Sequence, residues 1–188
     1  VTVDPPPTVT NATLTQTICS GGTATLIPSS GVINTTFTWT ATGSSVNVTG
    51  YTPAGSGTIG DVLTNTGTAS ETVNYVITPT GPAPSLCPGV PSNFVVTVNP
   101  APSVIVVPNQ TLCNGANTTA INFTSLTAGA AFSWTNNNTA IGLVAGGVGN
   151  IASFVATNTG TTSITVTVGG AGQNGNVSVT AQNSCGTS

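Results

Sequence analysis

The chain has 188 residues, and because it contains no lysine, arginine or histidine, its three carboxylates give it a net charge of −3. General acid–base catalysis needs a side chain that titrates near the working pH, and binding of phosphate groups or nucleic acid needs arginine or lysine. We therefore predict a structural or adhesive module that is not an enzyme, has no catalytic, cofactor-binding or metal site, and binds no nucleic acid.

The composition predicts an all-β chain with a substantial core. Apolar residues make up 38% of the sequence, threonine is the commonest residue, and the helix formers lysine, arginine and methionine are absent. β-Branched residues such as threonine, valine and isoleucine favour strands. No apolar run approaches the ~18 residues that span a bilayer, so we predict no membrane insertion.

In the first hundred residues, apolar–polar alternation between Gly, Pro and Asn turns predicts seven short strands. The expected strands are residues 8–13, 23–28, 36–42, 46–51, 58–63, 72–78 and 93–98. Seven strands at this spacing are typical of an antiparallel, immunoglobulin-like β-sandwich. Phe37 and Trp39 lie two residues apart and so share one strand face, which predicts that both are core aromatics.

The sequence then repeats itself. Three blocks recur in order, residues 16–21 as 110–115, 36–40 as 131–135 and 64–68 as 157–161. Such internal repetition indicates tandem domains. We therefore expect residues 1–7 to be the end of a preceding repeat with its proline linker, 8–100 to be one sandwich and 101–188 to be a second. Phe132 and Trp134 are the expected core aromatics of the second sandwich.

The second repeat is not a clean copy of the first. It carries additional strands near residues 163–168 and 177–181, joined by a glycine-rich turn at 169–172, and it has no counterpart of the strand at 93–98. Two explanations are open: the chain is a segment of a longer tandem array, or a neighbouring chain donates the last strand. Three residues before the first prolines are too few for a donor strand, so we favour the array.

These blocks resemble the PKD-like repeat, an immunoglobulin-like β-sandwich. The resemblance rests on Thr-Ile-Cys-Ser-Gly-Gly-Thr at 17–23, Thr-Phe-Thr-Trp-Thr-Ala at 36–41, Thr-Asn-Thr-Gly-Thr at 64–68 and Val-Thr-Val-Asn-Pro at 96–100. It implies a large secreted, cell-surface protein of Bacteroidetes-type bacteria, exported by a type IX route, with a role in adhesion, gliding or matrix. The expected function is thus an extracellular stalk or filament, whose partners are neighbouring repeats and other copies of the protein.

The four cysteines, Cys19, Cys87, Cys113 and Cys185, favour disulfides over zinc, because the chain has no histidine and no CxxC spacing. Pairing within repeats would join Cys19 to Cys87 and Cys113 to Cys185. The strand order, however, places Cys19 and Cys87 at opposite ends of a sandwich whose strands span about 20 Å. A disulfide needs Cα atoms within ~7 Å. In a head-to-tail array Cys19 could instead meet Cys185, which would stiffen the filament, and both pairings stay open.

Other candidate sites are weaker. Asp61 and Glu71 as a glycosidase carboxylate pair, and Asp4 as part of a calcium site, are both disfavoured. Attached glycans are a further way in which this sparsely charged surface could be kept soluble. Asn-x-Ser/Thr sequons begin at Asn11, Asn34, Asn47, Asn109, Asn117, Asn122, Asn137 and Asn176. The alternative function is a carbohydrate-binding accessory module of a secreted enzyme. Such modules display exposed aromatic rings, and here only Tyr51 is expected to do so.

Overall fold

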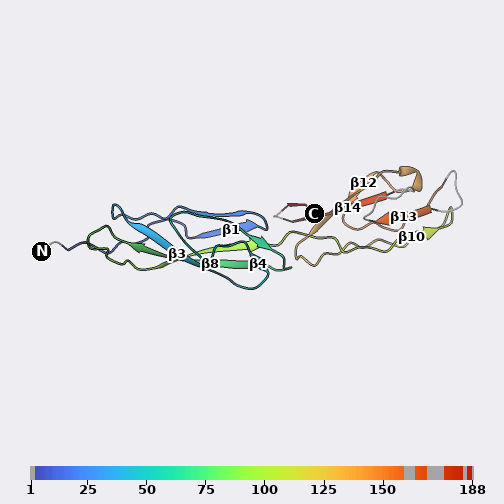
Figure 1. Cartoon of the computed structure of the whole chain (residues 1–188). Helices are drawn as coiled ribbons and strands as arrows, with labels where there is room; N and C mark the ends of the chain where they lie inside the picture. Colours follow the sequence, from blue (N-terminus) through green and yellow to red (C-terminus); the bar gives the residue numbers. More distant parts are fainter. Residues whose placement is uncertain (1–2, 159–163, 169–175, 184–185, 188) are drawn as a thin grey trace. The chain divides into compact units, whose positions relative to one another are not determined.

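The chain forms two compact units, Val1–Pro100 (unit 1) and Ala101–Ser188 (unit 2) (Figure 1). The computed structural model describes residues 3–158, 164–168, 176–183 and 186–187. These residues form β-strands and one short 3-10 helix, η1 (Thr139–Ile141), in agreement with the predicted all-β class. Within the described ranges, no helix has the length and apolar character needed to cross a membrane.

Unit 1 is a two-layer arrangement of short strands. Its strands are β1 (Thr15–Cys19), β2 (Thr23–Leu26), β3 (Thr36–Gly43), β4 (Val48–Thr49), β5 (Ala54–Ser56), β6 (Ile59–Val62), β7 (Thr64–Asn65), β8 (Glu71–Thr80) and β9 (Ser92–Asn99). Five of them form one sheet in the order β1-β9-β8-β3-β5. The antiparallel pairs β2–β6 and β4–β7 supply the opposing layer.

Alternation along the strands builds the core of unit 1. In β8 every second residue is buried, so that Val73, Tyr75 and Ile77 point inward. On β3, Trp39 is buried and Phe37 is partly buried against the same core, while the threonines that alternate with them, Thr36, Thr38 and Thr40, are exposed. The opposing layer contributes Ala24, Leu26, Val48, Ile59 and Leu63. These contacts between layers give the sandwich that the strand spacing predicts.

The start of unit 1 differs from the prediction. No strand forms at residues 8–13, where the side chain of Asn11 donates to the carbonyl of Ile27 at 2.8 Å and accepts from the amide of Ser29 at 2.9 Å. The first strand is instead β1, which pairs in parallel with β9. The sheet is therefore mixed, and the prediction of a purely antiparallel sandwich was wrong in this respect.

The segment between β3 and β6 also differs from the prediction. The expected strand at 46–51 is reduced to the two residues of β4, because Gly50 adopts a φ of 91° that interrupts the extended backbone. After this turn the chain forms β5, an unpredicted strand that pairs with β3 at the edge of the sheet. A loop that connects the two layers thus replaces a regular strand.

Unit 2 has a sheet of similar order. Its strands are β10 (Gln110–Leu112), β11 (Ala131–Asn136), β12 (Gly146–Val148), β13 (Ile164–Val168), β14 (Asn176–Asn183) and β15 (Gly186–Thr187), arranged as β10-β13-β14-β11-β12 with β15 beside β14. The strands expected near 163–168 and 177–181 are present as β13 and β14, and the turn expected at 169–172 lies outside the described residues. Trp134 is buried and Phe132 is partly buried against the core.

The position of β13 distinguishes the two sheets. In unit 1 the place between β1 and β8 is held by β9, which runs antiparallel to β8. In unit 2 the corresponding place, between β10 and β14, is held by β13, which runs parallel to β14. A strand from the additional segment of unit 2 therefore fills the sheet position that the last strand fills in unit 1.

Both units hold the segment after their first strand through a glutamine. In unit 1 the side chain of Gln16 donates to the carbonyl of Thr23 at 3.1 Å and accepts from the amide of Thr25 at 2.9 Å. In unit 2 the side chain of Gln110 donates to the carbonyl of Thr119 at 3.1 Å and accepts from its amide at 2.8 Å. The repeated sequence blocks therefore make closely matching local contacts.

Each unit also packs its tryptophan on a glycine of the edge strand. Trp39 lies opposite Gly55 on β5, and Trp134 lies opposite Gly147 on β12. A Cβ would lie 2.4 Å from Cζ2 of Trp39 at position 55, and 2.5 Å from Cζ2 of Trp134 at position 147. The indole rings thus occupy the space that a side chain on either edge strand would need.

Candidate functional site

The two cysteines of unit 1 lie at opposite ends of the unit. Cys19 ends β1 and is paired in register with Asn99 at the end of β9. Cys87 lies in the loop before β9, where its thiol contacts the carbonyl oxygen of Asp4 at 3.9 Å. The eight residues of β9 extend over ~23 Å at about 3.3 Å per residue, well beyond the ~7 Å that a disulfide tolerates. The bond between Cys19 and Cys87 is not formed, and Cys87 is a free thiol.

The pairing predicted within unit 2 is likewise not present. Cys113 directly follows β10, is exposed and is a free thiol. Cys185 lies outside the described residues. The pairing of Cys19 with Cys185 stays a prediction.

Asp61, on β6, connects the loop before β5 to the core. Its carboxylate accepts hydrogen bonds from the amide and the hydroxyl of Thr52 at 2.9 and 2.8 Å, and from the hydroxyl of Tyr75 at 2.8 Å. Burial of Tyr75, reinforced by its hydrogen bond to Asp61 and by the charge of that carboxylate, raises the pKa of the phenol. Tyr75 therefore remains a hydrogen-bond donor, and Asp61 has a structural role.

Glu71 belongs to a separate cluster at the start of β8. It accepts a short hydrogen bond from the hydroxyl of Ser44, and the side-chain amide of Asn47 lies 3.4 Å from its other oxygen. Hydrogen bonds from Ser44 and then Ser45 lower the pKa of Glu71. Glu71 and Asp61 therefore belong to separate hydrogen-bond clusters: Glu71 bonds to Ser44 and Asn47, and Asp61 bonds to Thr52 and Tyr75.

The lowered pKa of Glu71 predicts a specific pH dependence of stability. The ordinary value is 4.5, so the contribution of Glu71 should be complete above about pH 4.5 and lost as pH falls through the lower folded-state pKa. We expect the Tm of Glu71→Gln to fall less than that of the native chain on acidification, measured by calorimetry. Ile33→Ala, at an exposed residue outside this cluster, is the control and should follow the pH profile of the native chain. Identical pH profiles for Glu71→Gln and the native chain would contradict the prediction.

Asp4 is held by a neighbouring loop. Its carboxylate accepts a hydrogen bond from the hydroxyl of Ser85 at 2.7 Å. In the part of the chain that the structure describes, no three histidine, cysteine, aspartate or glutamate side chains come together in a way that could hold a metal ion. The geometry around Asp4 therefore offers one carboxylate, where calcium sites usually combine several oxygen ligands.

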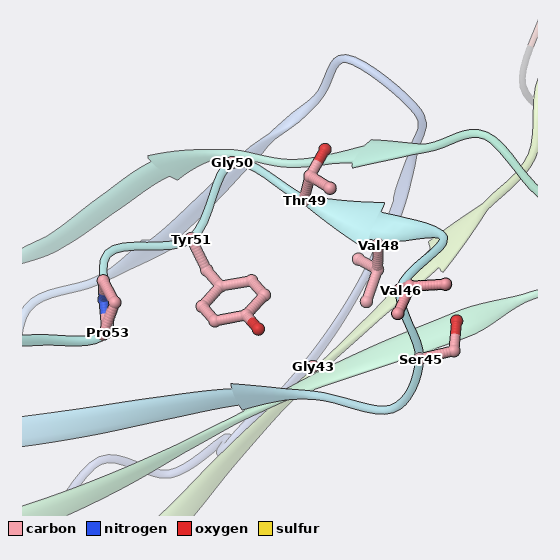
Figure 2. Close-up of a pocket in the computed structure, with 8 residues that line it drawn as sticks. All are labelled: Gly43, Ser45, Val46, Val48, Thr49, Gly50, Tyr51 and Pro53. Atoms are coloured by element: carbon pink, nitrogen blue, oxygen red, sulfur yellow. The ribbon is translucent and has the colours of Figure 1, made fainter.

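A surface pocket of about 680 Å³ lies on unit 1 between the end of β3 and the start of β5 (Figure 2). Tyr51 and Pro53 line one side, and Val46 and Val48 lie across from the Tyr51 ring. Val48 is buried whereas Val46 is 92% exposed, so the lining runs from the core out to solvent. Gly43, Ser45, Thr49 and Gly50 complete the lining.

Tyr51 is the aromatic residue of this pocket. Its ring is partly buried against the core of unit 1. Tyr75 is fully buried and faces the core, where it packs against Trp39 and Phe94. The sequence analysis named Tyr51 but could not find the pocket, because the end of β3, β4 and the turn at Gly50 surround the ring only once this segment of residues 43–53 has folded.

Comparison with known families finds a similarity over part of the chain. Residues 16–102 match the family model described as the PKD-like domain. The match begins at the second residue of β1 and ends just beyond β9, and it supports an immunoglobulin-like domain of this kind in unit 1. No curated protein matches the sequence significantly.

Proposed function

We propose that the chain is a structural and adhesive segment of an extracellular surface protein in which immunoglobulin-like units follow one another in tandem. The PKD-like match of residues 16–102 carries this proposal, because a domain of this kind suggests an extracellular, adhesion-type module. The absence of lysine, arginine and histidine from the whole sequence supports a non-enzymatic role. The same absence leaves no trypsin cleavage site, which suits a surface exposed to proteases.

Unit 2 is proposed to be a second repeat of the same kind, although the family match lies in unit 1. Two observations support this: the matching hydrogen bonds of Gln16 and Gln110, and the matching packing of each tryptophan on an edge-strand glycine. Separate sequence blocks produce both features, so chance similarity of one block does not explain them. The partners of the segment are then the neighbouring repeats and other copies of the protein, with glycans as a further surface component.

Disulfides between consecutive repeats are proposed to stiffen this array. Cys19 lies at the end of unit 1 from which the chain continues into unit 2, and Cys87 lies at the other end, beside Asp4. We propose that Cys19 pairs with Cys185. Cys87 and Cys113, both free thiols, would then pair with cysteines of the preceding and following repeats.

Peptide mapping without reduction tests the disulfide pattern. Chymotrypsin replaces trypsin, since the chain has no lysine or arginine. We expect a peptide containing Cys19 to be linked to one containing Cys185, while Cys87 and Cys113 of the 188-residue chain react with an alkylating reagent. A link between Cys19 and Cys87, or alkylation of Cys19, would overturn the proposed pattern.

Electron microscopy of the native surface protein tests the array itself. Before reduction we expect a thin, stiff fibre whose repeat is about the length of one sandwich, and after thiol reduction the same fibre should bend. Isolated flexible pairs of particles that do not respond to reductant would contradict the proposal of an array stiffened by disulfides.

A further inference from the structure

The loop that carries Tyr51 is fixed on both sides of the ring. Before it, Gly50 has a φ of 91°, and a Cβ there would lie 2.1 Å from the carbonyl oxygen of Val62. After it, Thr52 makes two hydrogen bonds to Asp61, and the carbonyl of Pro53 accepts from the amide of Ala41 at 2.8 Å. A ring held in this way loses little conformational entropy when a ligand binds.

The backbone opposite the ring leaves room for it. A Cβ at Gly43 would lie 2.9 Å from Cε1 of Tyr51 and 3.3 Å from its hydroxyl oxygen. The ring therefore rests on a glycine, across from Val46 and Val48 (Figure 2). Among the residues whose side chains the structure describes, none makes a hydrogen bond to the Tyr51 hydroxyl, so this group can bond to a ligand.

The chemistry of the pocket selects a neutral ligand rich in hydroxyls. Ser45 and Thr49 are among the residues that line it, and Ser45 also hydrogen-bonds to Glu71, whose lowered pKa keeps a carboxylate nearby. No cationic side chain exists anywhere in the chain to compensate an anionic ligand. A pyranose combines an apolar face, which stacks on an aromatic ring, with hydroxyls that bond to such a rim.

The aromatic ring is particular to unit 1. In unit 2 Gly142 reproduces the turn of Gly50, with the same φ of 91° and a similar approach to a carbonyl, that of Val155. The next residue there is Leu143, which is 7% exposed and belongs to the core. The same turn thus supports a core side chain in one unit and a ring at a surface pocket in the other.

We propose that the Tyr51 pocket binds one pyranose ring of a neutral saccharide, stacked on Tyr51 and hydrogen-bonded to the Tyr51 hydroxyl and to polar groups of the rim. This site would name the class of ligand to which the proposed adhesive segment binds. The saccharide proposal depends on unit 1 alone and not on the tandem array. Absence of saccharide binding would leave the tandem array intact, and flexible particles in the microscope would leave the saccharide site intact.

Amide-resolved NMR titration of the 188-residue chain tests the site. The probes are cellobiose, chitobiose and mannobiose, with sialyllactose as an anionic sugar and a proline-rich peptide as the competing ligand class. We expect at least one neutral disaccharide to shift the amides of residues 43–53, and sialyllactose and the peptide to leave them unchanged. No shift with any neutral disaccharide, or shifts only with sialyllactose or the peptide, would overturn the proposal.

Three variants and a control separate stacking from hydrogen bonding. Tyr51→Ala should weaken binding by about tenfold or more, the worth of one aromatic contact. Tyr51→Phe, which keeps the ring, and Ser45→Ala, which removes the hydroxyl of a lining residue, should each weaken it less. Ile33→Ala, at a residue 81% exposed outside the pocket, should leave it unchanged. Unchanged affinity in Tyr51→Ala, with an otherwise native spectrum, would contradict the assignment.

Discussion

Gly55→Ala is expected to lower the free energy of unfolding of unit 1 by about 2–3 kcal/mol, the upper part of the usual range for overpacking. A Cβ at position 55 would lie 2.4 Å from Cζ2 and 2.8 Å from Cε2 of Trp39. Both are atoms of a rigid indole that is only 6% exposed, so the ring cannot rotate away into solvent. Either the edge strand β5 must move outward or the core must repack.

Hydrogen–deuterium exchange measures this loss within one unit. Exchange in β8 should accelerate in Gly55→Ala, while exchange in β11 of unit 2 serves as the internal reference. Gly60→Ala is the matched control, because Gly60 also lies on a strand and a Cβ there would meet nothing within 4 Å. We expect it to change stability by no more than about 0.5 kcal/mol. Equal effects of the two substitutions would mean that the Trp39–Gly55 contact does not limit the packing.

The long strands of unit 1 could be predicted because their side chains alternate clearly. β8 and β9 follow strict alternation over many residues, as does β3 around Trp39. β1 escaped prediction because its alternation is weak: Thr15, Gln16 and Thr17 are all polar. Its parallel pairing with β9 depends on a contact between distant segments, which local sequence patterns do not contain.

The edge strands show a further limit of local patterns. Ala54, Gly55 and Ser56 form β5, although small residues have little intrinsic preference for strands. Position 55 requires a glycine because the indole ring of Trp39, on the neighbouring strand, leaves no room for a side chain. Gly147 meets the same requirement beside Trp134 in unit 2.

The pocket and the carboxylate clusters could be predicted only in part. The sequence identified Tyr51 as the ring available to a ligand and Tyr75 as a buried residue, through alternation with Val73 and Ile77. It did not show that Asp61 joins Tyr75 to Thr52, because these three residues lie on separate elements. Composition limited the chemistry of the chain, whereas the fold decided which side chains meet.

Asp61→Ala is expected to lower the free energy of unfolding of unit 1 by about 3–4 kcal/mol. The substitution removes three hydrogen bonds to a charged acceptor, each worth about 1.5–3 kcal/mol before non-additivity, and leaves the hydroxyl of Tyr75, a residue with no exposed surface, without its partner. Tyr75→Phe removes one of these bonds and no acceptor, so it should cost about 1–2 kcal/mol. Urea unfolding of each variant gives these values.

Asp4→Ala is the control that distinguishes the effect of losing the hydrogen bonds of Asp61 from the effect of losing its negative charge. It removes the same negative charge from an exposed carboxylate that accepts one side-chain bond, from Ser85, so we expect a change within about 0.5 kcal/mol. Asp61→Ala should also accelerate hydrogen exchange at Thr52, whose amide donates to the carboxylate. If Asp4→Ala destabilised the unit as much as Asp61→Ala, net charge rather than the Asp61 cluster would control stability. Because the same cluster fixes the loop of Tyr51, loss of saccharide binding in Asp61→Ala without unfolding would indicate that it also orders the pocket.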